Sequence, residues 1–140
     1  MTCAIVVGYG PTGRSVVEAL EKKNIEAIII DLNVDTVNEL VQNGKHAIYG
    51  DSTKRDILSD AGIEQAAYLI ITVADNTMTA GTVAAARTFN TDLKVLARVR
   101  FQQDEELIKT IGADYVAVEE SSVAKTLANV VMENLGETPE

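Results

Sequence analysis

The strongest constraint on the fold is the regular alternation of short, continuous apolar runs with longer segments of helical periodicity. Runs rich in Val and Ile without polar alternation are typical of parallel strands that are covered on both faces. Six strand–helix units in series predict an α/β fold, a Rossmann-type doubly wound six-stranded parallel sheet with helices on both faces. We expect strands at residues 4–7, 27–30, 46–49, 68–73, 95–97 and 115–118, and helices at 12–23, 35–42, 54–61, 77–89, 104–111 and 122–135.

Composition narrows the functional classes. The 140 residues are the size of one domain, and 46% of them are apolar, as in a folded globular protein. The net charge of −9 argues against a nucleic-acid or anionic-lipid surface, because both would repel the chain. A single Cys and a single His cannot build a metal cluster, so we expect no metal site.

The stretch GYGPTGRS at residues 8–15 fits two nucleotide-binding patterns. As G-x-x-x-x-G-K-S it would be a P-loop, but Arg14 replaces the lysine that reaches the phosphates. As G-x-G-x-x-G it is the turn of a Rossmann unit. There Gly8 permits the tight turn, Gly10 lets the backbone approach a pyrophosphate, and Gly13 lets helix and strand pack closely. An apolar strand precedes the motif and a helical pattern follows it, so the Rossmann interpretation is favoured.

Asp31 supports that interpretation and selects among cofactors. It ends the second apolar run, about twenty residues after the glycines, where Rossmann domains place the acid that binds the ribose hydroxyls. A carboxylate repels a 2′-phosphate, and residues 32–35 offer no Arg or Lys to bind one. The sequence therefore favours NAD(H) or an adenine mononucleotide and disfavours NADP. The alternative for Asp31 is a helix-capping carboxylate.

With these features the sequence resembles the RCK/KTN (TrkA-N) domain, and more closely the cytosolic C-terminal domain of Kef-type cation:proton antiporters and potassium-efflux systems. The stretches that carry the resemblance are IVVGYGPTG at residues 5–13, Ile30-Asp31, YGDST at 49–53, ITVADN at 71–76, LARVR at 96–100 and GAD at 112–114.

The resemblance implies a Rossmann domain, residues 1–136, followed by a disordered tail at 137–140. It implies that AMP or NAD(H), with ATP or ADP as further options, binds without being turned over. Asp51 and Ser52 would line the adenine pocket, and the loop at 72–76 would run along the ribose or the second half of a dinucleotide. Arg98 and Arg14 could meet phosphates. The expected ligand-binding residues are Gly8, Tyr9, Gly10, Pro11, Thr12, Gly13, Arg14, Asp31, Leu32, Asp51, Ser52, Thr72, Val73, Ala74, Asn76 and Arg98.

Besides Asp31, three of these residues keep an alternative interpretation. Asp51 could cap the third helix, Arg98 could form a surface or interface salt bridge, and Arg14 could be an exposed residue of the first helix.

The resemblance also implies a function: a ligand-sensing regulatory domain that gates a potassium or cation:proton transporter at the cytoplasmic face of the membrane. The transporter portion would belong to the same polypeptide or to a separate subunit, and the domains would form a homodimer. The stripe of Val123, Leu127, Val130 and Val131 could serve that dimer or pack on its own sheet. The alternative class is a small NAD-dependent oxidoreductase. Six strand–helix units leave no segment to close over a nicotinamide, so we expect no catalytic residues.

Overall fold

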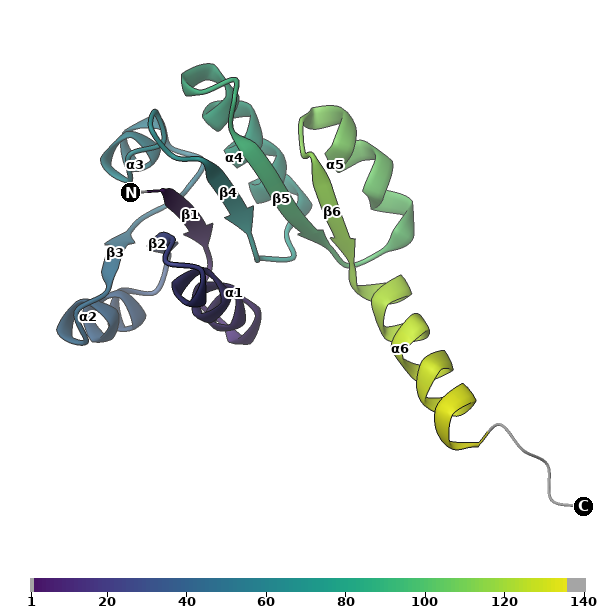
Figure 1. Ribbon diagram of the computed structural model, residues 1–140. Helices are drawn as coiled ribbons and strands as arrows, with labels where there is room; N and C mark the ends of the chain where they lie inside the picture. Colours follow the sequence, from purple (N-terminus) through teal and green to yellow (C-terminus); the bar gives the residue numbers. More distant parts are fainter. Residues whose placement is uncertain (1, 136–140) are drawn as a thin grey trace, which may run out of the picture.

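The computed structural model describes residues 2–135, which form one six-stranded parallel sheet in the order β3-β2-β1-β4-β5-β6 (Figure 1). This order and the helices on both faces confirm the predicted Rossmann-type α/β fold. The tail predicted at residues 137–140 lies outside the described residues. The elements are β1 (Cys3–Val7), α1 (Pro11–Lys22), β2 (Glu26–Asp31), α2 (Val34–Gln42), β3 (His46–Tyr49), α3 (Arg55–Asp60), β4 (Tyr68–Ile71), α4 (Asn76–Phe89), β5 (Lys94–Val99), the 3-10 turn η1 (Gln102–Asp104), α5 (Glu105–Ile111), β6 (Tyr115–Val118) and α6 (Glu119–Asn134).

Two element boundaries differ from the sequence prediction in ways that affect the site. β4 ends at Ile71, so Thr72 and Val73 lie in the loop at the carboxyl edge of the sheet. α6 begins at Glu119 rather than at residue 122, and it follows β6 without a connecting loop. Two carboxylates, Glu119 and Glu120, therefore occupy its first turn, where the helix dipole favours negative charge.

Alternate residues of each inner strand pack into different layers. Ile5, Val7 and Ile30 belong to the core under α3, α4 and α5, whereas Val6 and Ile29 pack with α1 and α2. Because both layers are apolar, the strands read as continuous hydrophobic runs in the sequence. The two layers hold β1 centrally, between β2 and β4.

The last helix does not pack on the sheet, so the interpretation in which its apolar stripe covers its own sheet is wrong. Figure 1 shows α6 extending away from the end of β6, and none of its residues is buried. The α1-side face of β4, β5 and β6 consequently has no helix of its own in the described chain. It forms a shallow apolar hollow of about 370 Å³, lined by Leu20, Ile25, Tyr68, Ile70, Lys94, Leu96 and Tyr115.

Candidate functional site

The candidate site lies where the strand order reverses, between β1 and β4, at the carboxyl edge of the sheet. Ligands of open α/β sheets bind at this position because the loops on its two sides diverge. Here the loops that follow β1, β2, β4 and β5 enclose a groove of about 330 Å³. Its lining residues are Gly8, Tyr9, Gly10, Pro11, Thr12, Gly13, Asp31, Thr72, Val73, Ala74, Arg98 and Arg100.

The three glycines of the turn have different physical roles. Gly8 has φ +96°, and a Cβ there would lie 2.7 Å from Thr72 Oγ1. A Cβ on Gly13 would lie 2.0 Å from the Gly8 carbonyl oxygen, so α1 can approach β1 only because this residue has no side chain. A Cβ on Gly10 would meet nothing within 4 Å. Gly8 and Gly13 therefore build the turn, whereas Gly10 leaves open space beside the N-terminus of α1.

That N-terminus carries the electrostatic character of an anion site. Gly10 is the N-cap residue, Pro11 is the first helical residue, and the first turn contains no acidic side chain. The first N–H groups of a helix have no partner within the helix, and the dipole adds partial positive charge there. The missing N–H of Pro11 costs little at this position. The end of the helix can therefore hold a phosphate.

Asp31 ends β2 directly beside the turn. Its Oδ2 accepts a hydrogen bond from the Tyr9 N–H at 2.8 Å, and its Oδ1 accepts one from the Asn33 N–H at 2.8 Å. Asn33, rather than Asp31, caps α2, because its side chain accepts from Asp35 and Thr36. Asp31 is therefore fixed in place while its carboxylate keeps lone pairs for the hydroxyls of a ribose.

An apolar slot continues the groove beyond Asp31. It holds about 90 Å³ and is lined by Val7, Gly8, Ile30, Asp31, Leu32, Gly50, Val73 and Met78. Leu32, at the mouth of the slot, is 57% exposed and so leaves apolar surface open to a ligand. Met78 was missed by the sequence analysis. Its position in the first turn of α4, three residues after the Asp75 cap, is the signal that could have found it.

Asp51 lies beside this slot in the loop after β3. Its Oδ1 accepts hydrogen bonds from the Thr53 N–H at 2.9 Å and from the Thr53 hydroxyl at 2.7 Å. These bonds lower the pKa of the Asp51 carboxyl below its ordinary value, so it is ionised at neutral pH. Asp51, Leu32 and Met78 share a second shallow cavity with Thr53, Asp75 and Thr77.

Two predicted ligand-binding side chains face the interior instead. Ser52 is fully buried, and its hydroxyl is hydrogen-bonded to the Thr82 hydroxyl at 2.8 Å, so the side chain supports the wall behind the slot. Thr72 is also buried, and it donates its hydroxyl hydrogen to the carbonyls of Val7 and Gly8, at 2.9 and 3.2 Å. The hydroxyls of both residues thus have partners within the protein, although Thr72 still lines the groove.

Arg98 crosses the groove from the end of β5. Its Nη1 donates to the Thr72 carbonyl at 2.9 Å and to the Thr12 hydroxyl at 3.2 Å, which brings the guanidinium to the N-terminus of α1. Its Nε donates to Glu119 Oε1 at 2.5 Å. Arg98 therefore lines the groove and also forms the ion pair of its alternative interpretation, while its contact with a phosphate stays a prediction.

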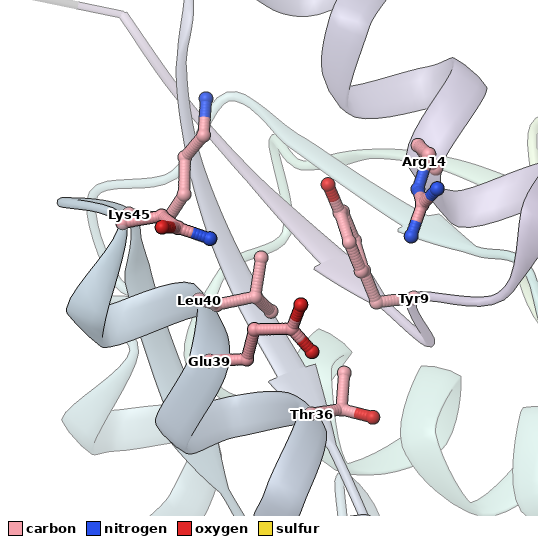
Figure 2. A pocket seen from close by; sticks show the side chains of 7 residues that line it. Tyr9, Arg14, Thr36, Glu39, Leu40 and Lys45 are labelled. Carbon is pink, nitrogen blue, oxygen red and sulfur yellow. The ribbon is translucent and has the colours of Figure 1, made fainter.

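Arg14 and Asn76 lie elsewhere. The Arg14 guanidinium lies 5.6 Å from the centre of the Tyr9 ring, and Figure 2 shows both side chains facing a separate polar pocket together with Glu39 and Lys45. Asn76 is the first residue of α4 and lines none of the cavities described above. The groove gains Arg100 in their place, a residue that the sequence analysis did not select.

Within residues 2–135, no set of three His, Cys, Asp or Glu side chains is arranged to hold a metal ion. No helix in the same residues combines the length and apolar character that crossing a bilayer requires.

The strand order, the glycine turn and the acid at the end of β2 define a Rossmann-type domain. More specifically, residues 4–119 match the TrkA-N domain, and the chain belongs to this family.

Among curated proteins, the chain is 30% identical over 128 residues to YbaL of Escherichia coli (strain K12), which is named as a candidate cation/proton antiporter. The alignment covers 91% of this chain but 23% of YbaL.

Solved structures of similar proteins have the same fold. The TrkA-N domain of E. coli inner membrane protein ybaL superposes with a TM-score of 0.89 at 29% identity, covering 93% of this chain and 96% of that one. GsuK bound to ADP superposes with a TM-score of 0.81 at 26% identity, covering 94% of this chain and 34% of that one.

Proposed function

We propose that this domain is a nucleotide sensor that binds AMP, ADP, ATP or NAD(H) in the groove and controls an attached cation or potassium transporter at the cytoplasmic face of a membrane. The observation that carries the proposal is the groove itself. It combines the open space beside Gly10 with the fixed carboxylate of Asp31 and the apolar slot between Leu32 and Met78. These features suit a phosphate, a ribose and a flat base, in that order along the edge of the sheet. The ADP-bound relative GsuK supports the same ligand class.

In this proposal each part of the groove has a separate role. The N-terminus of α1 and Arg98 would hold phosphate, and Asp31 would accept the ribose hydroxyls. The slot would bury the base, with the Asp51 carboxylate at its edge as an acceptor for an amino group. An ionised Asp51 suits adenine, which presents an amino group, better than guanine, which presents a carbonyl there.

We propose binding without turnover. Among the described residues that line the groove, the titratable side chains are Tyr9, Asp31, Arg98 and Arg100. Arginine does not deprotonate, Asp31 is held by two backbone N–H groups, and the Tyr9 ring lies against Arg14. None is placed as a proton donor for an oxidoreductase, so control would come from differential binding to two conformations.

The test is calorimetry with AMP, ADP, NADH, NAD and NADP on the wild-type domain and on Asp31→Ala. We expect binding of the adenine nucleotides, at least about tenfold weaker binding of NADP than of NAD, and a loss of about 1–3 kcal/mol in Asp31→Ala. Asp35→Ala is the matched control, because Asp35 is an exposed acid of α2 that does not line the groove. Equal affinity for NAD and NADP, or an equal loss in both variants, would contradict the ribose assignment. Mass spectrometry of any nucleotide released by denaturation identifies the ligand directly.

We also propose a homodimer in which α6 of one protomer covers the bare sheet face of the other. Val123, Leu127, Val130 and Val131 of α6 are 46–62% exposed, more than an isolated soluble domain ordinarily leaves uncovered on one helix. The hollow over β4, β5 and β6 is equally apolar and lies on the face that α6 leaves bare. Two complementary apolar surfaces on one chain suit a two-fold assembly, since each protomer supplies both halves of the contact.

A further inference from the structure

We propose that Glu119, the first residue of α6, is a built-in competitor for the phosphate of the nucleotide, so that ligand binding at Arg98 loosens the attachment of α6. This inference rests on the proposed function. It adds a residue and a route by which the groove would control the helix.

The Arg98 guanidinium lies close to the N-terminus of α1. Its Nη1 lies 3.2 Å from the Thr12 hydroxyl, in the first turn of α1, and 2.9 Å from the carbonyl of Thr72. A phosphate at the N-terminus of α1 would therefore be within reach of Arg98. Arg100, which is 61% exposed, lines the same groove.

Both arginines face the Glu119 carboxylate. Glu119 Oε1 accepts from Arg98 Nε at 2.5 Å and also pairs with its Nη2, while Glu119 Oε2 lies 4.0 Å from Arg100 Nε. One carboxylate thus faces both groove arginines. Arg98 has five N–H donors, and the contacts with Glu119, Thr72 and Thr12 engage most of them. An incoming phosphate must share or displace these contacts, and its charge repels Glu119.

Glu119 helps to attach the first turn of α6 to the rest of the domain. The first turn of this helix contacts the domain through a few polar bonds: Arg98 with Glu119, the Glu120 N–H with the Arg100 carbonyl at 3.2 Å, and the Glu120 carboxylate with the Gln102 N–H at 3.3 Å. No residue of α6 is buried, so apolar packing within the described chain does not fix its direction. Loss of the Arg98 contact would therefore remove the closer of the two ion pairs that Glu119 forms, leaving only the 4.0 Å contact with Arg100.

The coupling must be reciprocal. If phosphate binding weakens the Arg98–Glu119 pair, then any partner that holds α6 in its present position lowers the affinity for phosphate. The device needs no movement of the sheet, because Arg98 would only exchange one anion for another.

The experiment compares adenosine, AMP and ADP by calorimetry on the wild type, Glu119→Gln and Glu120→Gln. We expect Glu119→Gln to bind ADP about 5- to 20-fold more tightly, at the low end of usual couplings between two sites. Adenosine, which has no phosphate, should bind equally to all three proteins. Glu120→Gln is the matched control, because it removes the same charge from the same helical turn without touching Arg98, and its affinity for ADP should change less than twofold.

A second readout follows the helix. Amide hydrogen exchange of the first turn of α6, measured by NMR, should accelerate when ADP is added to the wild type, and should be fast with or without ADP in Glu119→Gln. Equal or weaker ADP binding in Glu119→Gln would show that Glu119 positions Arg98 and would overturn the inference alone. Equal tightening in both variants would overturn it as well, because only net charge would then matter. A wild-type protein that binds neither AMP nor ADP would overturn the proposed function and this inference together.

Discussion

The two halves of the sheet are stabilised in different ways. β1 and β2, in the N-terminal half, lie between α1 and α2 on one face and the core under α3 and α4 on the other. The C-terminal half has α4 and α5 on one face and an apolar hollow on the other. The half that carries the glycine turn is thus complete within one chain, whereas the half that ends in α6 exposes surfaces suited to a partner. Under the proposed function, the N-terminal half binds the nucleotide together with loops of the C-terminal half, whereas assembly uses the C-terminal half.

The largest effect on stability is expected in the N-terminal half of the sheet, at Gly13. In Gly13→Ala the new Cβ would start 2.0 Å from the Gly8 carbonyl oxygen, so α1 must move away from β1. We expect a loss of about 3 kcal/mol or more in the free energy of unfolding, measured by urea denaturation.

Gly10→Ala provides the control for that substitution. Its Cβ would meet nothing within 4 Å, so stability should change by less than about 1 kcal/mol while nucleotide affinity falls. Similar destabilisation by the two changes would show that the turn is not packed as described.

An intermediate effect, on assembly of the dimer, is expected in the C-terminal half of the molecule, at Leu127. Leu127 is 62% exposed in the single chain, so Leu127→Asp should leave the free energy of unfolding of the monomer within about 0.5 kcal/mol. In the proposed dimer the same change buries a charge, and the dissociation constant should rise roughly 30-fold or more, as measured by sedimentation. Asn129→Asp adds the same charge on the opposite side of α6 and should leave assembly intact. A wild-type protein that stays monomeric at high concentration would contradict the dimer.

The same contrast explains what the sequence could predict. The turn, the following helix and Asp31 are encoded by local rules: glycines at fixed spacing, an apolar strand and an acid at the next strand end. These rules place the groove without knowledge of long-range packing. The six-stranded parallel sheet also followed from the strand–helix alternation, whereas the order of its strands came from the structure.

The parts that sequence reasoning missed depend on contacts between distant segments. The periodicity of α6 identified its apolar stripe, but periodicity does not reveal which surface covers a stripe. The resemblance implied that Ser52, in the Gly-Asp-Ser-Thr stretch, lines the ligand pocket, yet its hydroxyl is hydrogen-bonded to Thr82, thirty positions away. Arg14 follows the glycine motif directly, but it lies over the Tyr9 ring, away from the groove. Neither side-chain direction is encoded in the spacing of the motif.

The smallest effect on stability is expected at a hydrogen-bond network around Arg87, in the C-terminal half of the sheet. Arg87, on α4, donates to the carbonyls of Leu93 and Gly112 and to Asp114 Oδ2, at 2.5, 2.7 and 3.0 Å. Asp114 Oδ2 also accepts the Val95 N–H at 2.8 Å. This network joins the beginnings of β5 and β6, on the half of the sheet that lacks a second layer of helices. In Asp114→Asn the charge is lost but one acceptor remains, so we expect a loss of about 1 kcal/mol in the free energy of unfolding.

The pH dependence separates this charge effect from a loss of shape. The Val95 N–H and then the Arg87 guanidinium lower the pKa of the Asp114 carboxyl below its ordinary value of 3.8. The folded state therefore binds this proton less readily than the unfolded state, and the stabilisation is complete above the unfolded pKa. It is lost as the pH falls through the lower, folded pKa. The stability difference between the wild type and Asp114→Asn should thus be full near pH 7 and shrink toward about pH 3. Asp92→Asn, an exposed acid in the loop before β5, should differ little from the wild type at either pH. A difference for Asp114→Asn that is constant with pH would mean that side-chain shape, rather than the ionised carboxylate, holds β5 to β6.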